Sequence, residues 1–343
     1  MQLARAWRNW TPRNVIRTVD AHAEGESLRV IFDGLPDIAG ASQLERRRHA
    51  RQHLDALRTA LMWEPRGHAD MYGCILTPAA EPADFGVLFL HNEGFSTMCG
   101  HGIIAVTTVV LETGLFPMRE PETVLRIDTP AGIVTARAAV DQGHVRTVAF
   151  ENVPSFVTEL DAVVDVPGLG RIGYDLAFGG AFYAYVDADA LGLPLASAHA
   201  REIIETGMAI KRAVMQSRAI EHPVDPDLGF LYGTIFVGRA ELPDSHSRNV
   251  CVFAEGEVDR SPTGTGVSGR LAIHQARGQI ETGQAIWIES IIGTRFRGRV
   301  LETTKVAGRP AIVPEVQGRA FLTGRHEFWL DPADPLAHGF FLR

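Results

Sequence analysis

The chain has 343 residues, of which 45% are hydrophobic and 22% are charged, a balance typical of a globular protein. A formal net charge of −8 argues against nucleic acid or an anionic membrane surface as a partner, and no apolar run is long enough to span a bilayer. The cysteines Cys74, Cys99 and Cys251 suit a reducing compartment, which we take to be the cytoplasm, better than a disulfide framework.

The N-terminal segment before Asp20 contains several Arg residues and no acid, a composition that weakly resembles an organelle targeting segment. Trp7, Trp10 and Pro12 interrupt it, and it has no apolar core of the secretory kind. We therefore expect a short native extension, followed by a first strand over 15–19.

The first half of the chain reads as alternating strands and helices. Apolar stretches predict strands, and residues 44–62 have the periodicity of an amphipathic helix. Ile103–Thr113 is apolar on nearly every side and is followed by Gly114, which predicts a buried helix with a glycine stop. The expected strands are 15–19, 28–32, 86–90, 124–127 and 133–140.

The second half repeats this order of elements. Asn152–Phe156 contains Asn, Pro and Ser between strand-like segments, which indicates a crossing point between two domains. We place the first domain at 1–155 and the second at 156–343, and expect the apolar tail at 340–342 to return to the first domain. The expected strands are 182–187, 231–238 and 250–254, and the expected helices are 198–217 and 267–277.

Two glycine-rich motifs align as copies of one unit. Met98-Cys-Gly-His-Gly102 and Asp259-Arg-Ser-Pro-Thr-Gly-Thr-Gly266 are related by the 164 residues that separate Cys99 from Thr263. At the same offset each copy has an apolar strand, a polar loop, an x-Gly-x-Gly segment, a helix and a glycine stop. Matching pairs are Phe89 with Phe253, Glu93 with Glu257, Gly100 with Gly264, Gly102 with Gly266 and Gly114 with Gly278.

The glycine-rich segments lie where two helices begin. Glycine permits close approach of a ligand to the backbone, and free N–H groups at a helix N-terminus attract anions. Two such ends facing each other would hold one carboxylate, and the same field would depress the pKa of Cys99. The structural alternative for Cys99 is an inert buried thiol.

These residues resemble the proline racemase family, which has Met-Cys-Gly-His-Gly in its first half and Asp-Arg-Ser-Pro-Cys-Gly-Thr-Gly in its second. The resemblance runs from about Val15 to the C-terminus. Supporting stretches are Asp20–Glu26, Glu64–Met71, Asp128–Gly132, Asn152–Phe156, Phe178–Tyr183 and His246–Asn249.

The resemblance implies an α/β fold of the diaminopimelate-epimerase type. Such a fold has two pseudo-symmetric domains, each with a sheet wrapped around a central helix, and an active site in the cleft between them. It also implies that backbone amides at Gly100, His101, Gly264 and Thr265 bind the substrate carboxylate, and that Asp259 contacts the ring nitrogen. The alternative for Asp259 is a loop or helix cap, and the His101 side chain either faces the nitrogen or packs.

Racemases and epimerases of this family use two cysteines, one on each face of the α-carbon, whereas the second position here is Thr263. A Thr hydroxyl is too weak an acid to serve as a free base near neutral pH. The departure resembles the trans-3-hydroxy-L-proline dehydratase branch, in which Cys99 would remove the α-proton and the 3-hydroxyl would leave. Thr263 would then either hydrogen-bond near the leaving oxygen or only fill space.

The rival functions are a hydroxyproline 2-epimerase or proline racemase, a thiol hydrolase using Cys99 with His101, and a non-catalytic amino-acid-binding protein. We expect no cofactor and no metal, because His91, His101 and His246 include no close pair with zinc-ligand spacing. The expected partner is a small-molecule substrate of the hydroxyproline class, with a homodimer possible. His22 and Glu26 lie in a glycine-containing stretch that we interpret as a turn after the first strand, with a place in the cleft as the alternative.

Overall fold

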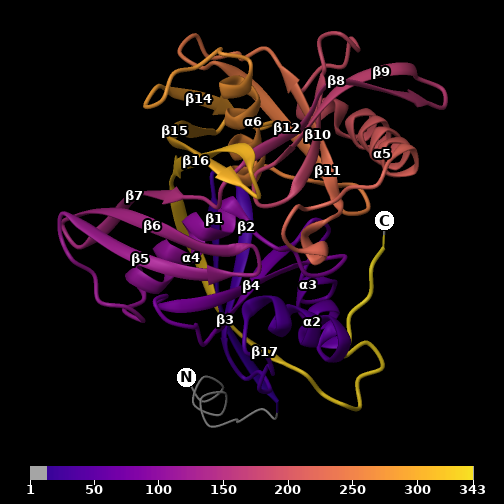
Figure 1. Cartoon of the computed structure of the whole chain (residues 1–343). Coiled ribbons are helices and arrows are strands. Elements are labelled where there is room, and N and C mark those ends of the chain that lie inside the picture. Colours follow the sequence, from indigo (N-terminus) through magenta and orange to yellow (C-terminus); the bar gives the residue numbers. More distant parts are fainter. Residues whose placement is uncertain (1–13, 343) are drawn as a thin grey trace.

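The computed structural model describes residues 14–342 and shows two α/β halves stacked one above the other (Figure 1). The N-terminal extension expected from the sequence falls almost entirely outside these residues. Within them, no helix combines the length and the apolar character needed to cross a membrane.

The first half begins with a tight hairpin in which Glu24 and Gly25 form the turn at positive φ. Its helices are α2 (Gln43–His53), α3 (Asp55–Met62) and α4 (Gly100–Glu112). Its strands are β1 (Val15–Ala23), β2 (Glu26–Asp33), β3 (Tyr72–Thr77), β4 (Phe85–His91), β5 (Glu122–Thr129), β6 (Gly132–Asp141) and β7 (His144–Glu151).

The second half has the same order of elements, and a last strand, β17 (Ala320–Trp329), follows it. Its helices are η1 (Ser197–His199), α5 (Ala200–Ser217), η2 (Pro226–Leu228) and α6 (Gly264–Ala276). Its strands are β8 (Phe156–Val166), β9 (Gly170–Phe178), β10 (Phe182–Asp187), β11 (Leu231–Gly238), β12 (Ser247–Phe253), β13 (Glu257–Val258), β14 (Ala285–Glu289), β15 (Arg295–Val306) and β16 (Arg309–Gly318).

Strand pairing shows the internal duplication directly. The first half pairs in the order β17-β1-β2-β3-β4-β5-β6-β7, with β2–β3 and β4–β5 parallel and the other pairs antiparallel. The second half pairs as β8-β9-β10-β11-β12-β14-β15-β16, with β10–β11 and β12–β14 parallel. Antiparallel pairing of β7 with β16 joins the two. Since β17 occupies in the first half the place that β8 has in the second, the C-terminal strand completes the N-terminal half.

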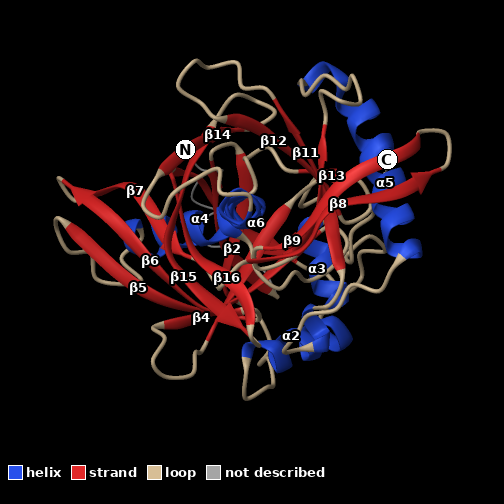
Figure 2. Ribbon diagram, turned by 45° about the horizontal axis from the view of Figure 1, so that its top comes forward, coloured by secondary structure: helices blue, strands red, loops and turns tan. Residues whose placement is uncertain are grey.

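A central helix lies inside each half, with strands curving around it (Figure 2). Gly100–Leu111 of α4 and Gly264–His274 of α6 are buried residue by residue. A helix that is apolar on all sides needs such enclosure. Both helices have 13 residues and start at the 164-residue offset of the sequence repeat. The fold therefore brings two related helix N-termini into the interior.

Most of the expected elements are present, with local differences. The single helix expected over 44–62 is two helices, because Leu54 leaves the helical conformation at φ −119° and buries its side chain. The boundary that we propose at 155/156 falls between β7 and β8. The tail approaches the first half, where Phe340 forms a bridge with Glu64.

Candidate active site

The N-termini of α4 and α6 touch at their first glycines. A Cβ atom added to Gly264 would lie 2.7 Å from the Cα atom of Gly100, and one added to Gly100 would lie 2.5 Å from the Cα atom of Gly264. Backbone meets backbone here, so no side chain can move aside. These two positions require glycine for close approach, and the unpaired amides of both helix ends consequently face one small space.

Cys99 is the N-cap residue of α4 and is 5% exposed. Its Sγ atom accepts a hydrogen bond from the Gly102 N–H at 3.3 Å and lies 3.3 Å from His101 Nδ1. The sequence placed the thiol at the helix start, and the structure adds a direct contact between the Cys99 and His101 side chains. Asp259 Oδ2 lies 4.0 Å from the same His101 Nδ1, which is too far for a hydrogen bond, so this carboxylate does not orient the imidazole as the base that the hydrolase alternative requires.

Burial raises the pKa of Cys99 well above its ordinary value, and the nearby charges of Asp259 and Glu26 raise it further. The Gly102 N–H opposes this rise but does not overcome it. The depressed pKa expected from the helix N-terminus is therefore wrong for this site, because desolvation and the nearby carboxylates outweigh the hydrogen bond from the Gly102 N–H. Burial also lowers the pKa of His101, which favours the neutral imidazole.

Thr263 breaks the symmetry between the two helix ends. Its φ of +63° is rare for a β-branched residue, and its side chain does not cap α6. Instead, Thr263 Oγ1 donates to Asp259 Oδ2 at 2.8 Å, and Thr263 N donates to Ser261 Oγ at 3.1 Å. Asp259 Oδ1 accepts from the Ser261 N–H at 2.8 Å. The loop thus fixes both the Thr263 hydroxyl and the carboxylate.

The remaining site residues expected from the sequence lie together at the helix ends. Gly100, His101, Gly264 and Thr265 all border one small cavity of about 20 Å³. The Thr265 hydroxyl is fixed by a 2.7 Å hydrogen bond to the Tyr183 hydroxyl. The cavity has room for about one water molecule, so the two halves must separate before an amino acid can bind.

Three buried residues that the sequence analysis did not assign to the site lie in or beside it. Tyr72 from β3 and Cys251 from β12 line the cavity, and the Cys251 side chain is fully buried. Glu26 lies at the turn after β1. Its Oε2 atom accepts a hydrogen bond from the Arg260 N–H at 2.7 Å, and its Oε1 atom is buried without a hydrogen-bond partner. Burial raises the pKa of Glu26 well above its ordinary range. No sequence motif marks Tyr72 or Cys251, since both read as strand residues.

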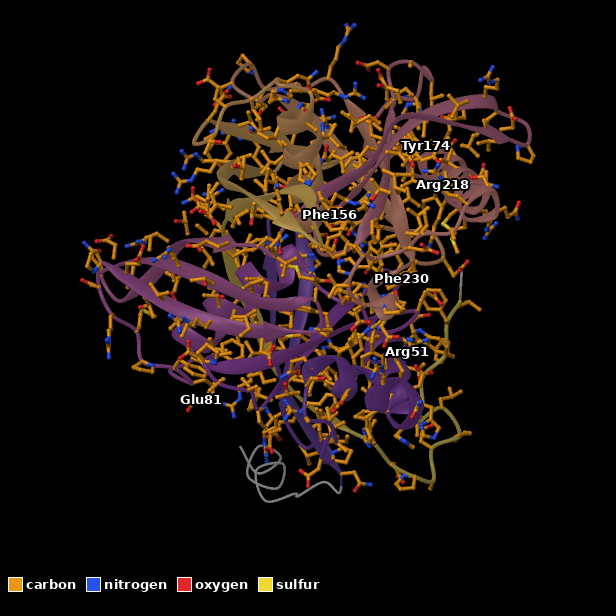
Figure 3. All side chains as sticks on the ribbon, viewed as in Figure 1. Arg51, Glu81, Phe156, Tyr174, Arg218 and Phe230 are labelled. Carbon is orange, nitrogen blue, oxygen red and sulfur yellow. The ribbon has the colours of Figure 1, made fainter. Side chains whose placement is uncertain are left out.

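An open cleft lies beside the cavity at the junction of the two halves. Arg51 from α2 and Phe230, which precedes β11, border this cleft (Figure 3). Tyr232 lines both the cleft and the cavity and forms part of the wall between them. Across residues 14–342, no group of three or more His, Cys, Asp or Glu side chains is arranged to hold a metal ion.

Comparison with known proteins agrees with this architecture. The family described as proline racemase matches residues 18–341. A trans-3-hydroxy-L-proline dehydratase from Colwellia psychrerythraea is 44% identical over 100% of this chain and 98% of its own, and a 3-hydroxyproline 2-epimerase from Burkholderia multivorans is 45% identical over 96% and 98%. The crystal structure of a hydroxyproline epimerase from Agrobacterium vitis, with bound trans-4-OH-L-proline, superposes with a TM-score of 0.91 at 38% identity and covers 96% of each chain. The fold class and the resemblance inferred from the motifs are confirmed.

Proposed function

The chain belongs to the proline racemase family, and from this premise we propose that it is a dehydratase that removes water from trans-3-hydroxy-L-proline. One observation carries the choice among family activities. Cys99 and Thr263 occupy equivalent positions at two touching helix ends, so one face of the cavity has a thiol where the other has a hydroxyl. Of the two groups, only the thiol is acidic enough to lose its proton in an active site and then act as a base.

The charges in the site suit a zwitterionic amino acid. The amides of Gly100, His101, Gly264 and Thr265 would bind the substrate carboxylate, and Asp259 would contact the ring nitrogen. A bound ammonium group would place a positive charge directly beside Asp259 and Cys99. It offsets the effect of the carboxylate on Cys99 and shifts the thiol toward the thiolate, since an opposite charge favours the ionised form.

The reaction then follows from the single base. The Cys99 thiolate removes the α-proton, which the neighbouring ammonium and the bound carboxylate make more acidic. The electron pair left on Cα forms a double bond to C3 as the 3-hydroxyl leaves. The enamine product tautomerises to Δ1-pyrroline-2-carboxylate with no net change in protons, and no cofactor takes part.

A 2-epimerase acting on 3-hydroxyproline is the second candidate, because Cys251 provides a thiol in the same cavity as Thr263. Burial raises the pKa of Cys251 as it raises that of Cys99, so these shifts do not separate the two functions. A proton relay to Cys251 would have to pass through the Thr263 hydroxyl, whose hydrogen is donated to Asp259 Oδ2 at 2.8 Å. The dehydratase is therefore the better supported function.

Incubation of the purified protein with trans-3-hydroxy-L-proline in heavy water, followed by NMR, separates the two candidates. We expect Δ1-pyrroline-2-carboxylate as the product and no inversion of trans-4-hydroxy-L-proline, which has no leaving group next to the α-carbon. Replacing Thr263 by Cys should add some 2-epimerase activity toward the 4-hydroxy substrate. Efficient inversion by the wild-type protein without dehydration would refute the proposal.

A further inference from the structure

The stereochemistry of the substrate fixes the face from which the hydroxyl leaves, and the following inference rests on the dehydratase function proposed above. In trans-3-hydroxy-L-proline the hydroxyl and the carboxylate lie on opposite faces of the ring. The α-hydrogen also lies opposite the carboxylate, so it shares a face with the hydroxyl. If Cys99 removes that hydrogen, the oxygen departs on the Cys99 face and not on the Thr263 face.

Tyr72 is the hydroxyl-bearing side chain of the first half that lines the cavity beside Cys99. Its ring stands edge-on to the His101 imidazole, with centroids 4.9 Å apart. A hydrogen bond from Tyr72 to the thiol lowers the pKa of Cys99 in part. Tyr72 is therefore within proton-transfer reach of the sulfur atom and borders the space that the substrate must occupy.

The surroundings of Tyr72 leave its own proton available. The Tyr72 hydroxyl lies 2.6 Å from Ser96 Oγ and 3.0 Å from the Tyr232 hydroxyl. Both neighbours can donate to the Tyr72 oxygen, whose two lone pairs accept them. The Tyr72 hydrogen can then point to the Cys99 thiol in the free protein and turn to the 3-hydroxyl oxygen when the substrate is bound. The same two donors would stabilise a transient phenolate.

We propose that Tyr72 donates the proton to the departing 3-hydroxyl, so that dehydration is a syn elimination in which both proton transfers occur on the Cys99 face. Cys99 accepts the α-proton, the C3–O bond breaks, and the oxygen leaves as water with the Tyr72 proton. The Cys99 thiol then returns its proton to the Tyr72 phenolate. Both residues are restored, and the α-proton now resides on Tyr72, from which it leaves in the water molecule of the next turnover.

Neither other candidate donor fits this role as well. Thr263 lies on the opposite face, and its hydroxyl already donates to Asp259. His101 is neutral, because burial lowers its pKa. Burial raises the pKa of Tyr72 well above its usual value, so Tyr72 carries its proton at neutral pH.

The first test compares two leaving groups in a Tyr72→Phe variant. With trans-3-hydroxy-L-proline we expect kcat to fall by about a hundredfold or more, in the range of a lost general acid. With trans-3-fluoro-L-proline, whose fluoride leaves without a proton, we expect a much smaller loss, due only to the missing hydrogen bond that lowers the pKa of Cys99. Tyr185→Phe is the matched control: it also removes a buried tyrosine hydroxyl, one that donates to Gly266 O at 2.8 Å outside the cavity, and it should leave both rates unchanged.

Equal losses on both substrates would assign Tyr72 a packing or binding role and overturn the inference, as would no loss on either. A second test needs no variant. The wild-type protein should dehydrate the trans isomer and not cis-3-hydroxy-L-proline, whose hydroxyl lies on the face away from the α-hydrogen, so equal dehydration of both isomers would overturn the syn geometry. Wild type that dehydrates neither isomer refutes the proposed function itself, whereas activity that survives Tyr72→Phe refutes only the role of Tyr72.

Discussion

Replacing Asp259 by Asn separates binding of the substrate nitrogen from support of the loop. An Asn side chain keeps the acceptor for the Ser261 N–H through Oδ1 and places its amide group toward the Thr263 hydroxyl, which can turn to accept. The two loop contacts of 2.8 Å therefore have replacements, and only the negative charge is lost. A charged contact in a water-excluded site contributes ~2–4 kcal/mol to transition-state stabilisation, so kcat/KM for trans-3-hydroxy-L-proline should fall by roughly 30- to 900-fold.

The same substitution should change the reactivity of the free thiol in the opposite direction. The Asp259 charge raises the pKa of Cys99, so a neutral side chain lowers that pKa and increases the thiolate fraction at any pH below it. Iodoacetamide should label Cys99 in the Asp259→Asn variant faster than in wild type, and faster than Cys74 or Cys251. Bound pyrrole-2-carboxylate should protect Cys99. If the variant has wild-type kcat/KM and wild-type labelling, Asp259 is only a structural cap.

Three further substitutions test other parts of the site. Cys99→Ser should abolish dehydration with little change in Tm, and robust turnover in a folded variant would remove the mechanism. Gly264→Ala places a Cβ 2.7 Å from the Gly100 backbone, so the helix ends must separate by about 1 Å and kcat/KM should fall roughly a hundredfold. The control is Gly173→Ala, where a Cβ meets open space and kcat/KM should not change. Equal effects of the two substitutions would disprove the close-approach argument. Cys251→Ala should leave dehydration intact. If this variant cannot dehydrate the substrate, Cys251 takes part in the chemistry, as in the proton relay through Thr263.

The sequence predicted the two central helices well because each follows an x-Gly-x-Gly segment and ends next to a glycine stop, Gly114 or Gly278. It did not predict β3, β7, β8, β9 and β13 or the strands after α6. Some of these strands are half-exposed: in β8 only Phe156, Val164 and Val166 are buried, so the apolar pattern of β8 is weak. The pairing of β17 with β1 joins residues about 310 positions apart, and no local pattern in the sequence can indicate such a contact.

For the candidate site, too, the sequence predicted the features that depend on local pattern and missed those that depend on the whole fold. The duplication brought Cys99 and Thr263 to equivalent helix ends, because glycine spacing and helix starts are local properties. Tyr72 and Cys251 were missed, since each belongs to a buried strand and shows its polar atom only where the two halves meet. The direction of the pKa shift of Cys99 was predicted wrongly for a related reason. The helix end can be recognised in the sequence, whereas the degree of burial and the positions of Asp259 and Glu26 depend on the whole fold.

The Asp259 carboxylate links recognition of the substrate to its chemistry. Burial and the charge of Asp259 keep the Cys99 thiol protonated, so in the free protein Cys99 is a poor nucleophile toward electrophiles. A ligand with a carboxylate but no cationic nitrogen could occupy the helix ends and would still leave the thiol protonated. An amino acid supplies a positive charge as it binds, and this charge acts on both the α-proton and the thiol. Under the proposed function, selection for an amino acid over a hydroxy acid is therefore set by activation of Cys99 as well as by affinity.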